Sequence, residues 1–253
     1  MAAVLNEDAL RRALRAAGVT APVRWDEVTS STNATAWEMA MAGAPAWTLV
    51  AAGHQMAGRG RRGRAWVNRP GAALLCSVVL RPSLATDRAG LLSLAAGVAA
   101  AEAGSSLSPR EVRCKWPNDL IVGGSKVGGV LGESRISGGR VDHVVIGLGV
   151  NLELPEAVPG AGALGGVSAE ALLTDFLSRF RTLAEGRPEE ILDRWREVSD
   201  TLGRHVEATT VGGDTVRGVA ADLDEDGSLL VETGVGVVPV AFGEVEHLRT
   251  PEA

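Results

Sequence analysis

Two long strand-like segments lie next to each other near the middle of the chain and restrict the folds open to it. They span residues 126–135 and 141–150 and are rich in apolar, β-branched residues and glycine. Ser-Gly-Gly at 137–139 lies between them and is typical of a tight hairpin turn. Because such a turn joins antiparallel strands, we expect a hairpin-connected sheet rather than a regular βαβ series.

The rest of the chain predicts helices and further strands around this hairpin. Capping residues, apolar stripes and terminal glycines predict helices over residues 7–17, 34–41, 91–103, 169–184 and 188–200. Apolar runs bounded by turn residues predict strands over 25–28, 47–52, 74–80 and 111–116. We therefore expect an α+β fold with a mixed, largely antiparallel sheet flanked by helices.

The chain changes character near its end. Short strands are predicted over residues 205–210, 215–222, 229–232 and 237–242, and glycines separate them. This pattern is typical of a small all-β barrel or sheet. We expect two domains, spanning residues 1–201 and 202–253.

Composition and charge exclude several classes of protein. A chain of 253 residues can bury an ordinary core without disulfides or a structural metal. Its formal net charge of -6 disfavours a dedicated duplex-DNA binder, since such proteins are usually basic. Cys76 and Cys114 are too few for a disulfide framework or a zinc site, and the four histidines stand apart. No secretory signal or membrane-spanning segment is recognisable, so a cytoplasmic protein is expected.

Residues 58–66, Gly-Arg-Gly-Arg-Arg-Gly-Arg-Ala-Trp, form the most unusual part of the sequence, here called the arginine segment. Its glycines match a dinucleotide-binding G-x-G-x-x-G, but that loop must open a helix and this one leads into a strand. The Gly-Lys pair of a P-loop and the motifs of a protein kinase are also missing. Four guanidinium groups so close together predict an anion site in a loop that is mobile when empty. Trp66 offers a flat face on which a base can stack.

Two further polar segments lie at the ends of predicted elements. Ser-Thr-Asn at 31–33 offers hydroxyls and an amide in one small turn, although simple helix capping would use the same residues. In Lys-Trp-Pro-Asn-Asp at 115–119, the proline stops the strand, so Lys115 should project at a strand end. An ammonium group there can hold a carboxylate and a phosphate together. The alternative is a surface lysine before a turn.

Glycines interrupt both strands of the central hairpin. Gly128 and Gly129 lie in the first strand, and Gly147 and Gly149 in the second. Glycine weakens a strand, so it marks either a close approach by a ligand or another backbone, or a mere bulge. The second strand ends in the amide side chain of Asn151.

Taken together and in this order, the five segments resemble the biotin protein ligase family. They read Ser-Thr-Asn; Gln55 followed by the arginine segment; Lys-Trp-Pro-Asn-Asp; Lys-Val-Gly-Gly-Val-Leu; and Gly-Leu-Gly-Val-Asn. The resemblance covers residues 25–152 strongly and extends loosely into the C-terminal β segment. It implies a catalytic domain similar to class II aminoacyl-tRNA synthetases, followed by a small SH3-like domain.

The resemblance also implies a two-step reaction. Biotin and MgATP give biotinoyl-5′-AMP and pyrophosphate, and the biotinoyl group then passes to one lysine of a carrier protein. Cationic side chains suit the first step, because they offset the repulsion between a carboxylate and a triphosphate. Closure of the arginine segment over the adenylate would keep water from a reactive mixed anhydride.

Individual residues receive roles from the same resemblance. Those implied to bind biotin are Ser31, Thr32, Asn33, Gln55, Arg59, Gly60, Arg61, Lys115, Gly128, Gly129 and Gly149. Those implied to bind ATP and the adenylate are Arg61, Arg62, Arg64, Trp66, Lys115, Asn118, Lys126 and Asn151, with Asp119 beside them. The catalytic residues would be Lys115, Arg59 and Arg61. No all-protein metal site is implied, since phosphates and one or two carboxylates can hold Mg²⁺.

The implied protein partner is the biotin carboxyl carrier domain of an acyl-CoA carboxylase. Some members of the family carry an N-terminal winged helix-turn-helix and repress biotin synthesis. Only 30 residues precede Ser31 here, and they are predicted to hold one helix and one strand. Sequence-specific DNA binding is therefore not expected. No membrane partner is expected either.

Three alternatives stay open. A lipoate protein ligase shares the fold and the adenylate chemistry, but its Arg-Arg-x-x-Gly-Gly-Gly loop and His-Asp pair are missing here. A related octanoyltransferase needs a cysteine nucleophile, whereas strand alternation points Cys114 away from the face of Lys115 and into the core. A nucleic-acid-binding module would use the arginine segment alone and bind in a salt-dependent way. The composition argues against this alternative, because the chain has 25 lysines and arginines but 31 acidic residues, and no second basic stripe.

Overall fold

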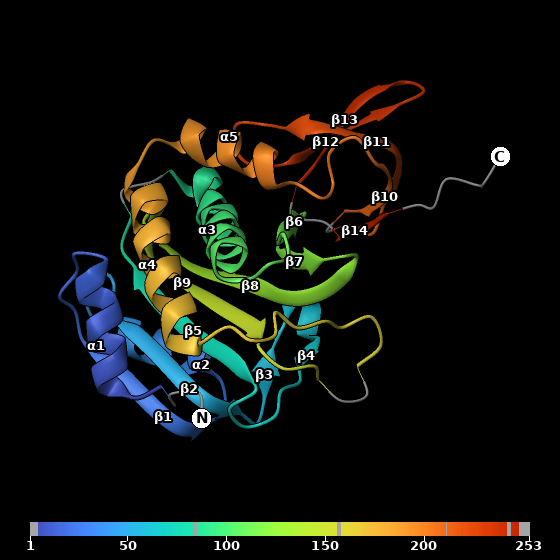
Figure 1. Cartoon of the computed structure of the whole chain (residues 1–253). Coiled ribbons are helices and arrows are strands. Elements are labelled where there is room, and N and C mark those ends of the chain that lie inside the picture. Colours follow the sequence, from blue (N-terminus) through green and yellow to red (C-terminus); the bar gives the residue numbers. More distant parts are fainter. Residues whose placement is uncertain (1–4, 83–84, 156–157, 211, 242–243, 248–253) are drawn as a thin grey trace.

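The centre of the structure is a seven-stranded sheet (Figure 1). The computed structural model describes residues 5–82, 85–155, 158–210, 212–241 and 244–247. The strands lie in the order β1 (Val23–Thr29), β2 (Leu49–Gln55), β5 (Ala73–Leu80), β9 (Arg140–Asn151), β8 (Ser125–Ser137), β7 (Asp119–Val122) and β6 (Arg113–Lys115). β1 and β2 are parallel, and the other neighbouring pairs are antiparallel. The predicted mixed, largely antiparallel sheet is confirmed.

The predicted central hairpin is formed by β8 and β9. Its strands pair down to Ser137 opposite Arg140, so that two residues remain for the turn. These are Gly138 and Gly139, with φ angles of 56° and 73°. A type I′ turn requires positive φ at both positions, and glycine adopts it without a steric cost. The sequence therefore determines where the turn lies and which residues of the two strands face each other.

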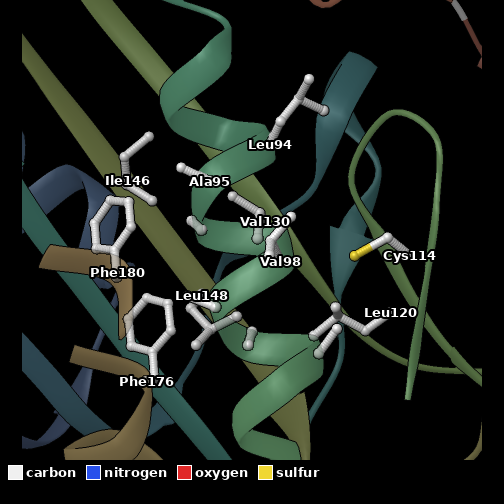
Figure 2. Packing of buried hydrophobic residues seen from close by; sticks show 14 of the residues in the cluster. Leu94, Ala95, Val98, Cys114, Leu120, Val130, Ile146, Leu148, Phe176 and Phe180 are labelled. Carbon is white, nitrogen blue, oxygen red and sulfur yellow. The ribbon is translucent and has the colours of Figure 1, made fainter. Parts of the chain in front are cut away.

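Helices cover both faces of this sheet. Among the described residues, α1 (Glu7–Ala16), α3 (Leu91–Leu107), α4 (Ala169–Glu185) and α5 (Pro188–Val198) lie on one side, and α2 (Thr32–Met41) lies on the other (Figure 1). Leu94 and Val98 of α3 pack near Val130 and Leu148 of the hairpin (Figure 2). No helix within the described ranges is long and apolar enough to cross a membrane.

A second, five-stranded sheet follows the helices. Its order is β13 (Gly236–Val240), β12 (Leu229–Thr233), β11 (Thr215–Leu223), β10 (His205–Thr209) and β14 (Glu244–His247), with all neighbours antiparallel. The expected small all-β region is thus confirmed, and with it the α+β class. Phe242, the last residue of the predicted fourth strand, lies outside the described residues. The boundary between residues 201 and 202 stays a prediction.

Several short elements differ from the sequence-based expectation. β7 and β14 were not predicted, because four residues are too few to show a strand period. The arginine segment is not an open loop: β3 (Gly58–Arg59) and β4 (Ala65–Trp66) pair around a single 3₁₀ turn. Trp47, expected within a strand, precedes β2 with a φ of 67°.

Candidate active site

A cavity of about 280 Å³ opens on the face of the central sheet that α2 covers. The predicted site residues that line it are Ser31, Thr32, Asn33, Gln55, Arg59, Gly60, Arg61, Arg64, Trp66, Lys115, Asn118, Asp119, Lys126, Gly129 and Gly149. Its other lining residues are Ala65, Trp116, Pro117, Val130, Leu131, Gly147, Leu148 and Val245. Residues from seven separate parts of the chain are therefore brought to one place.

One end of the cavity consists of uncharged polar side chains that hold one another. α2 begins at Thr32, so Thr32 and Asn33 lie in its first turn and Ser31 is the N-cap residue. Gln55, at the end of β2, accepts hydrogen bonds on Oε1 from the backbone N–H of Thr32 (2.7 Å) and from its hydroxyl (3.1 Å). The Ser31 side chain makes no capping hydrogen bond. Simple helix capping therefore does not account for this turn.

Asn33 is held in one orientation by neighbours that sequence reasoning missed. Its Nδ2 donates to the carbonyl of Leu131 (3.2 Å) and to Oε2 of Glu133 (2.8 Å). Its Oδ1 accepts from the hydroxyl of Ser77 at 2.6 Å. Since an amide oxygen can only accept, the single Ser77 proton is committed to this bond. The amide cannot flip without breaking these contacts.

Of the two missed residues, Ser77 has a signal that the sequence does contain. Ser77 is a polar residue within the apolar run of β5, and it is fully buried. A buried polar side chain requires partners, so a lone serine within an apolar strand points to a site. Glu133 carries no such signal, since it is only half-buried and stands in a polar stretch of β8 beside Ser134 and Arg135. Glu133 Oε2 also lies 3.4 Å from Nη2 of Arg59 and so links α2 to the arginine segment.

Two glycines of β9 leave room for side chains from other elements. A Cβ atom on Gly147 would lie 2.0 Å from Oδ1 of Asn33. One on Gly149 would lie 2.9 Å from Cε2 of Trp66. Real Cβ atoms do not approach other atoms so closely, so both positions need glycine. A close approach is confirmed at both positions, but the approaching groups are side chains of the protein, neither a ligand nor another backbone.

The arginine segment forms one wall of the cavity. Gly60 donates its N–H to the carbonyl of Arg64 (2.7 Å), which closes the short turn. Arg59, Arg61 and Arg64 line the cavity from this turn. The indole N–H of Trp66 is buried and has no hydrogen-bond partner among the described residues. Trp66 therefore presents both a flat ring and an unsatisfied donor.

Lys115 lies at the other end of the cavity, at the last position of β6. Its ammonium group has no hydrogen-bond or ion-pair partner within the described part of the chain. The neighbouring cation Lys126 is different, since its Nζ lies 2.6 Å from Oδ1 of Asp119. Asn118 donates Nδ2 to the carbonyl of Val130 (2.7 Å), which holds the turn onto β8.

Three predicted site residues do not line this cavity. Gly128 lies on the opposite face of β8, where a Cβ atom would meet the Gly149 carbonyl at 2.7 Å. Arg62, at a φ of 52°, donates to the carbonyl of Thr210 (2.9 Å). Asn151 donates to the Gly162 carbonyl at 3.0 Å. Strand alternation explains Gly128, because adjacent residues of a strand face opposite sides of the sheet.

Both cysteines are buried in the core. Cys114 is 3% exposed and lies within the apolar cluster drawn in Figure 2, while Lys115 faces the cavity. Burial raises the pKa of the Cys76 thiol to about 12. Burial, and then the negative charge of Glu102, raises the pKa of the Cys114 thiol as well. Since the thiolate is the nucleophile, neither thiol suits covalent catalysis.

The two ends of the cavity favour different ligand groups. Buried hydroxyls and amides fixed in place suit a neutral polar group that both donates and accepts hydrogen bonds. Lys115 suits carboxylates and phosphates, and Arg61 and Arg64 add positive charge to the lining. Among the described residues, no group of three or more His, Cys, Asp or Glu side chains could hold a metal ion. Asp119 provides a carboxylate to the lining.

Comparison with family profiles identifies two matching regions. Residues 25–151 match the profile described as the Biotin/lipoate A/B protein ligase family. Residues 201–248 match the profile of the Biotin protein ligase C terminal domain. The first match contains the residues that line the cavity, except Val245.

Curated relatives extend over most of the chain. The chain is 35% identical over 237 residues to the biotin--[acetyl-CoA-carboxylase] ligase of Mycobacterium tuberculosis, covering 87% of both proteins. It is 36% identical to the protein of the same name from Paracoccus denitrificans, covering 84% of this chain and 96% of that protein. It is 31% identical to the bifunctional ligase/repressor BirA of Bacillus subtilis, covering 96% and 79%.

Solved structures share the fold. Biotin protein ligase from Aquifex aeolicus in complex with biotin and ATP superposes with a TM-score of 0.74 at 24% identity, covering 90% of this chain and 99% of that one. Biotin protein ligase from Leishmania major in complex with biotinyl-5-AMP gives a TM-score of 0.61 at 25% identity, covering 92% and 100%.

Proposed function

Because the chain belongs to the biotin/lipoate A/B protein ligase family, we propose that it activates biotin with ATP and transfers the biotinoyl group to a carrier protein. The observation that carries this proposal is the pairing of a neutral, prearranged hydrogen-bonding end with a cationic end in one cavity. Biotin has the same polarity: a neutral ureido ring at one end and a carboxylate at the other.

In the first step, a biotin carboxylate oxygen attacks the α-phosphorus of ATP, and pyrophosphate leaves. Both reactants are anionic and repel each other. The ammonium group of Lys115 can contact both, and the guanidinium groups of Arg61 and Arg64 add positive charge. Charges held in place before the reaction stabilise the transition state without reorganisation.

The ureido ring belongs at the opposite end, by this proposal. There Ser31, Thr32, Asn33 and Gln55 provide hydroxyl and amide groups whose orientations are fixed by their own hydrogen bonds. Trp66 supports the nucleotide, since this residue lines the same cavity and its ring offers a stacking surface. Asn118 and Lys126 line the nucleotide side.

Magnesium would enter with ATP. The residues present fit this role, since Asp119 supplies one carboxylate to the lining, and its Oδ1 also contacts Lys126. Mg²⁺ commonly binds through one or two carboxylates plus substrate phosphates, so this donor set is sufficient. When bound, the ion neutralises charge on the phosphates. Asp119 would hold it, while Lys115 and the arginines contact the substrates directly.

In the second step, a neutral lysine amine of the carrier attacks the acyl carbon, AMP leaves, and an amide bond forms. The arginine segment would keep water from the mixed anhydride until the carrier arrives. We propose the biotin carboxyl carrier domain of an acyl-CoA carboxylase as the acceptor, because the curated relatives carry that enzyme in their names. Because the proposed reaction uses ATP and a carboxylase, we propose that it takes place in the cytoplasm.

Intact-mass spectrometry of a biotin carboxyl carrier domain tests the proposal. The domain is incubated with the protein, biotin and MgATP, and parallel reactions omit ATP or replace biotin with lipoate. We expect one biotinoyl addition that requires ATP and a single acceptor lysine. Addition of lipoate but not biotin would assign the related lipoate ligase activity instead. If neither group is added, the arginine segment needs another ligand, and nucleic-acid binding becomes the next assay.

A further inference from the structure

The residues on both sides of Lys115 are tied to a distant part of the chain. β6 is a three-residue strand at the edge of the central sheet, and β7 is its neighbour there. On its other side lies the segment 199–201, which follows α5. The carbonyl of Cys114 accepts the N–H of Asp200 (2.7 Å), and the N–H of Trp116 donates to the hydroxyl of Thr201 (2.9 Å). Lys115 therefore sits between two fixed backbone groups.

The Trp116 side chain makes a second connection, to the C-terminal sheet. It is 2% exposed, and its indole N–H donates to the carbonyl of Gly227 (3.1 Å). Gly227 lies in the turn between β11 and β12, with a φ of 86°. A Cβ atom there would lie 2.7 Å from Cδ1 of Leu94 in α3. The turn is thus pressed between α3 and Trp116, and its carbonyl has a fixed position.

These contacts have a consequence for the reaction. The Lys115 ammonium group makes no contact of its own with the described residues that would hold it, so its position depends on its backbone. The strand that carries it is too short to be fixed by β7 alone. Effective catalysis requires reacting groups to be placed within a fraction of an ångström, and an error of 1 Å can reduce the rate by about 100-fold.

We propose that Thr201 and Trp116 are positioning residues, which hold Lys115 in the cavity by attaching β6 to the segment 199–201 and to the β11–β12 turn. Neither residue needs to touch the reacting atoms. The C-terminal sheet thereby acts on the chemical step through the backbone of the lysine. This inference rests on the proposed function, because it concerns the same lysine.

Pyrophosphate release with biotin and MgATP tests the inference, with kcat and KM for biotin determined separately. Thr201→Val keeps the shape of the side chain but removes the oxygen that accepts the Trp116 N–H, and Trp116→Phe removes the indole N–H. For both we expect kcat to fall about 10- to 100-fold, with KM for biotin within about two-fold of the parent. The reason is that the ureido end of the cavity lies on other elements.

Two further variants separate positioning from packing. Thr201→Ser retains a hydroxyl and should restore kcat to within about three-fold of the parent. Trp195→Phe is the matched control: Trp195 is 1% exposed in α5, and its indole makes no hydrogen bond to the described residues. It should lose stability through packing but keep kcat. Thermal unfolding of each variant shows whether it is folded.

The outcomes are distinct. A parent protein that releases no pyrophosphate contradicts the proposed function itself. An active parent with unchanged kcat in Thr201→Val and Trp116→Phe overturns the positioning role, as does an equal loss in Trp195→Phe. If Thr201→Val does not fold, the comparison of Trp116→Phe with Trp195→Phe decides the matter alone.

Discussion

Lys115 differs from the other lysine of the cavity in what surrounds it. Lys126 is neutralised by Asp119 at 2.6 Å, whereas Lys115 has no such partner among the described residues. Its full charge is therefore available to the substrates. We expect Lys115→Ala to reduce adenylate formation by at least about 100-fold, the size of effect that follows when a preorganised electrostatic group is removed.

Release of pyrophosphate measures this effect. Arg140→Ala serves as the control, because it removes an exposed cation at the turn end of β9, far along the strand from the site. It should leave the rate unchanged. Normal pyrophosphate release by a folded Lys115→Ala protein would show that Lys115 has no part in the first step.

Gly147 gives a second prediction at the scale of one residue. The methyl group of Gly147→Ala would lie 2.0 Å from Oδ1 of Asn33, so the Asn33 amide must move and its bond to Ser77 must break. We expect KM for biotin to rise about 10-fold or more, since a site built on hydrogen bonds loses much when one group is misplaced. KM for ATP should change far less.

Steady-state kinetics with each substrate varied in turn provides the measurement. Gly234→Ala is the control, because a Cβ atom there meets no atom within 4 Å. Equal increases of KM for biotin and for ATP in Gly147→Ala would contradict a local effect on the ureido end.

At the scale of elements, the proposed role of the arginine segment depends on its closure over the adenylate. β3 and β4 hold its two ends together, and Arg59 reaches Glu133 at 3.4 Å. Arg61 lies in the turn between them and lines the cavity. We expect Arg61→Ala to release biotinoyl-AMP about 10-fold faster than the parent, because the closed turn loses a charge-assisted contact to the phosphate.

Rapid filtration of the preformed adenylate complex, followed by chromatography of the filtrate, measures this release. Thermal unfolding should show little change, since Arg61 is at the surface of the cavity and not in the core. If the variant loses biotinoyl-AMP no faster than the parent, the arginine segment does not retain the adenylate by closing over it.

How much could be predicted also varies from element to element. The β8–β9 hairpin could be predicted because Gly138 and Gly139 allow the positive φ angles of a tight turn. Helix α3 could be predicted from its long apolar run. The hydrogen bonds that orient Asn33 could not be predicted, because Ser77 and Glu133 meet it only in the folded sheet. Gly128 and Gly129 look equivalent in the sequence, yet strand alternation separates them, and only Gly129 lines the cavity.

At the scale of the whole molecule, the connection between the two sheets is what the sequence shows least. The segment 199–201 was assigned in part to a helix, although α5 ends at Val198 and the next three residues contact β6. These contacts join positions more than eighty residues apart, beyond the reach of any local pattern. An ion pair strengthens the same junction, since Nε of Arg196 lies 2.7 Å from Oδ1 of Asp222 in β11.

This ion pair makes stability depend on pH in a predictable direction. Burial alone would raise the pKa of Asp222, but the hydrogen bond from Arg196, the Leu223 N–H and the charge of Arg196 outweigh it and lower the pKa. A carboxyl group whose pKa is lowered on folding stabilises the protein above its unfolded pKa of about 3.9. That contribution is lost as the pH falls through the lower, folded pKa.

We therefore expect Asp222→Asn to be less stable than the parent by about 0.5–1 kcal/mol at pH 7, the size usual for a pair this exposed. The difference should shrink as the pH falls below about 4. Urea unfolding at a series of pH values measures it. Glu232→Gln is the control, since Glu232 is an exposed carboxylate on β12 without an ion-pair partner among the described residues. A difference that stays constant down to the acid limit would mean that Asp222 acts through packing, and the junction between the sheets would then owe nothing to charge.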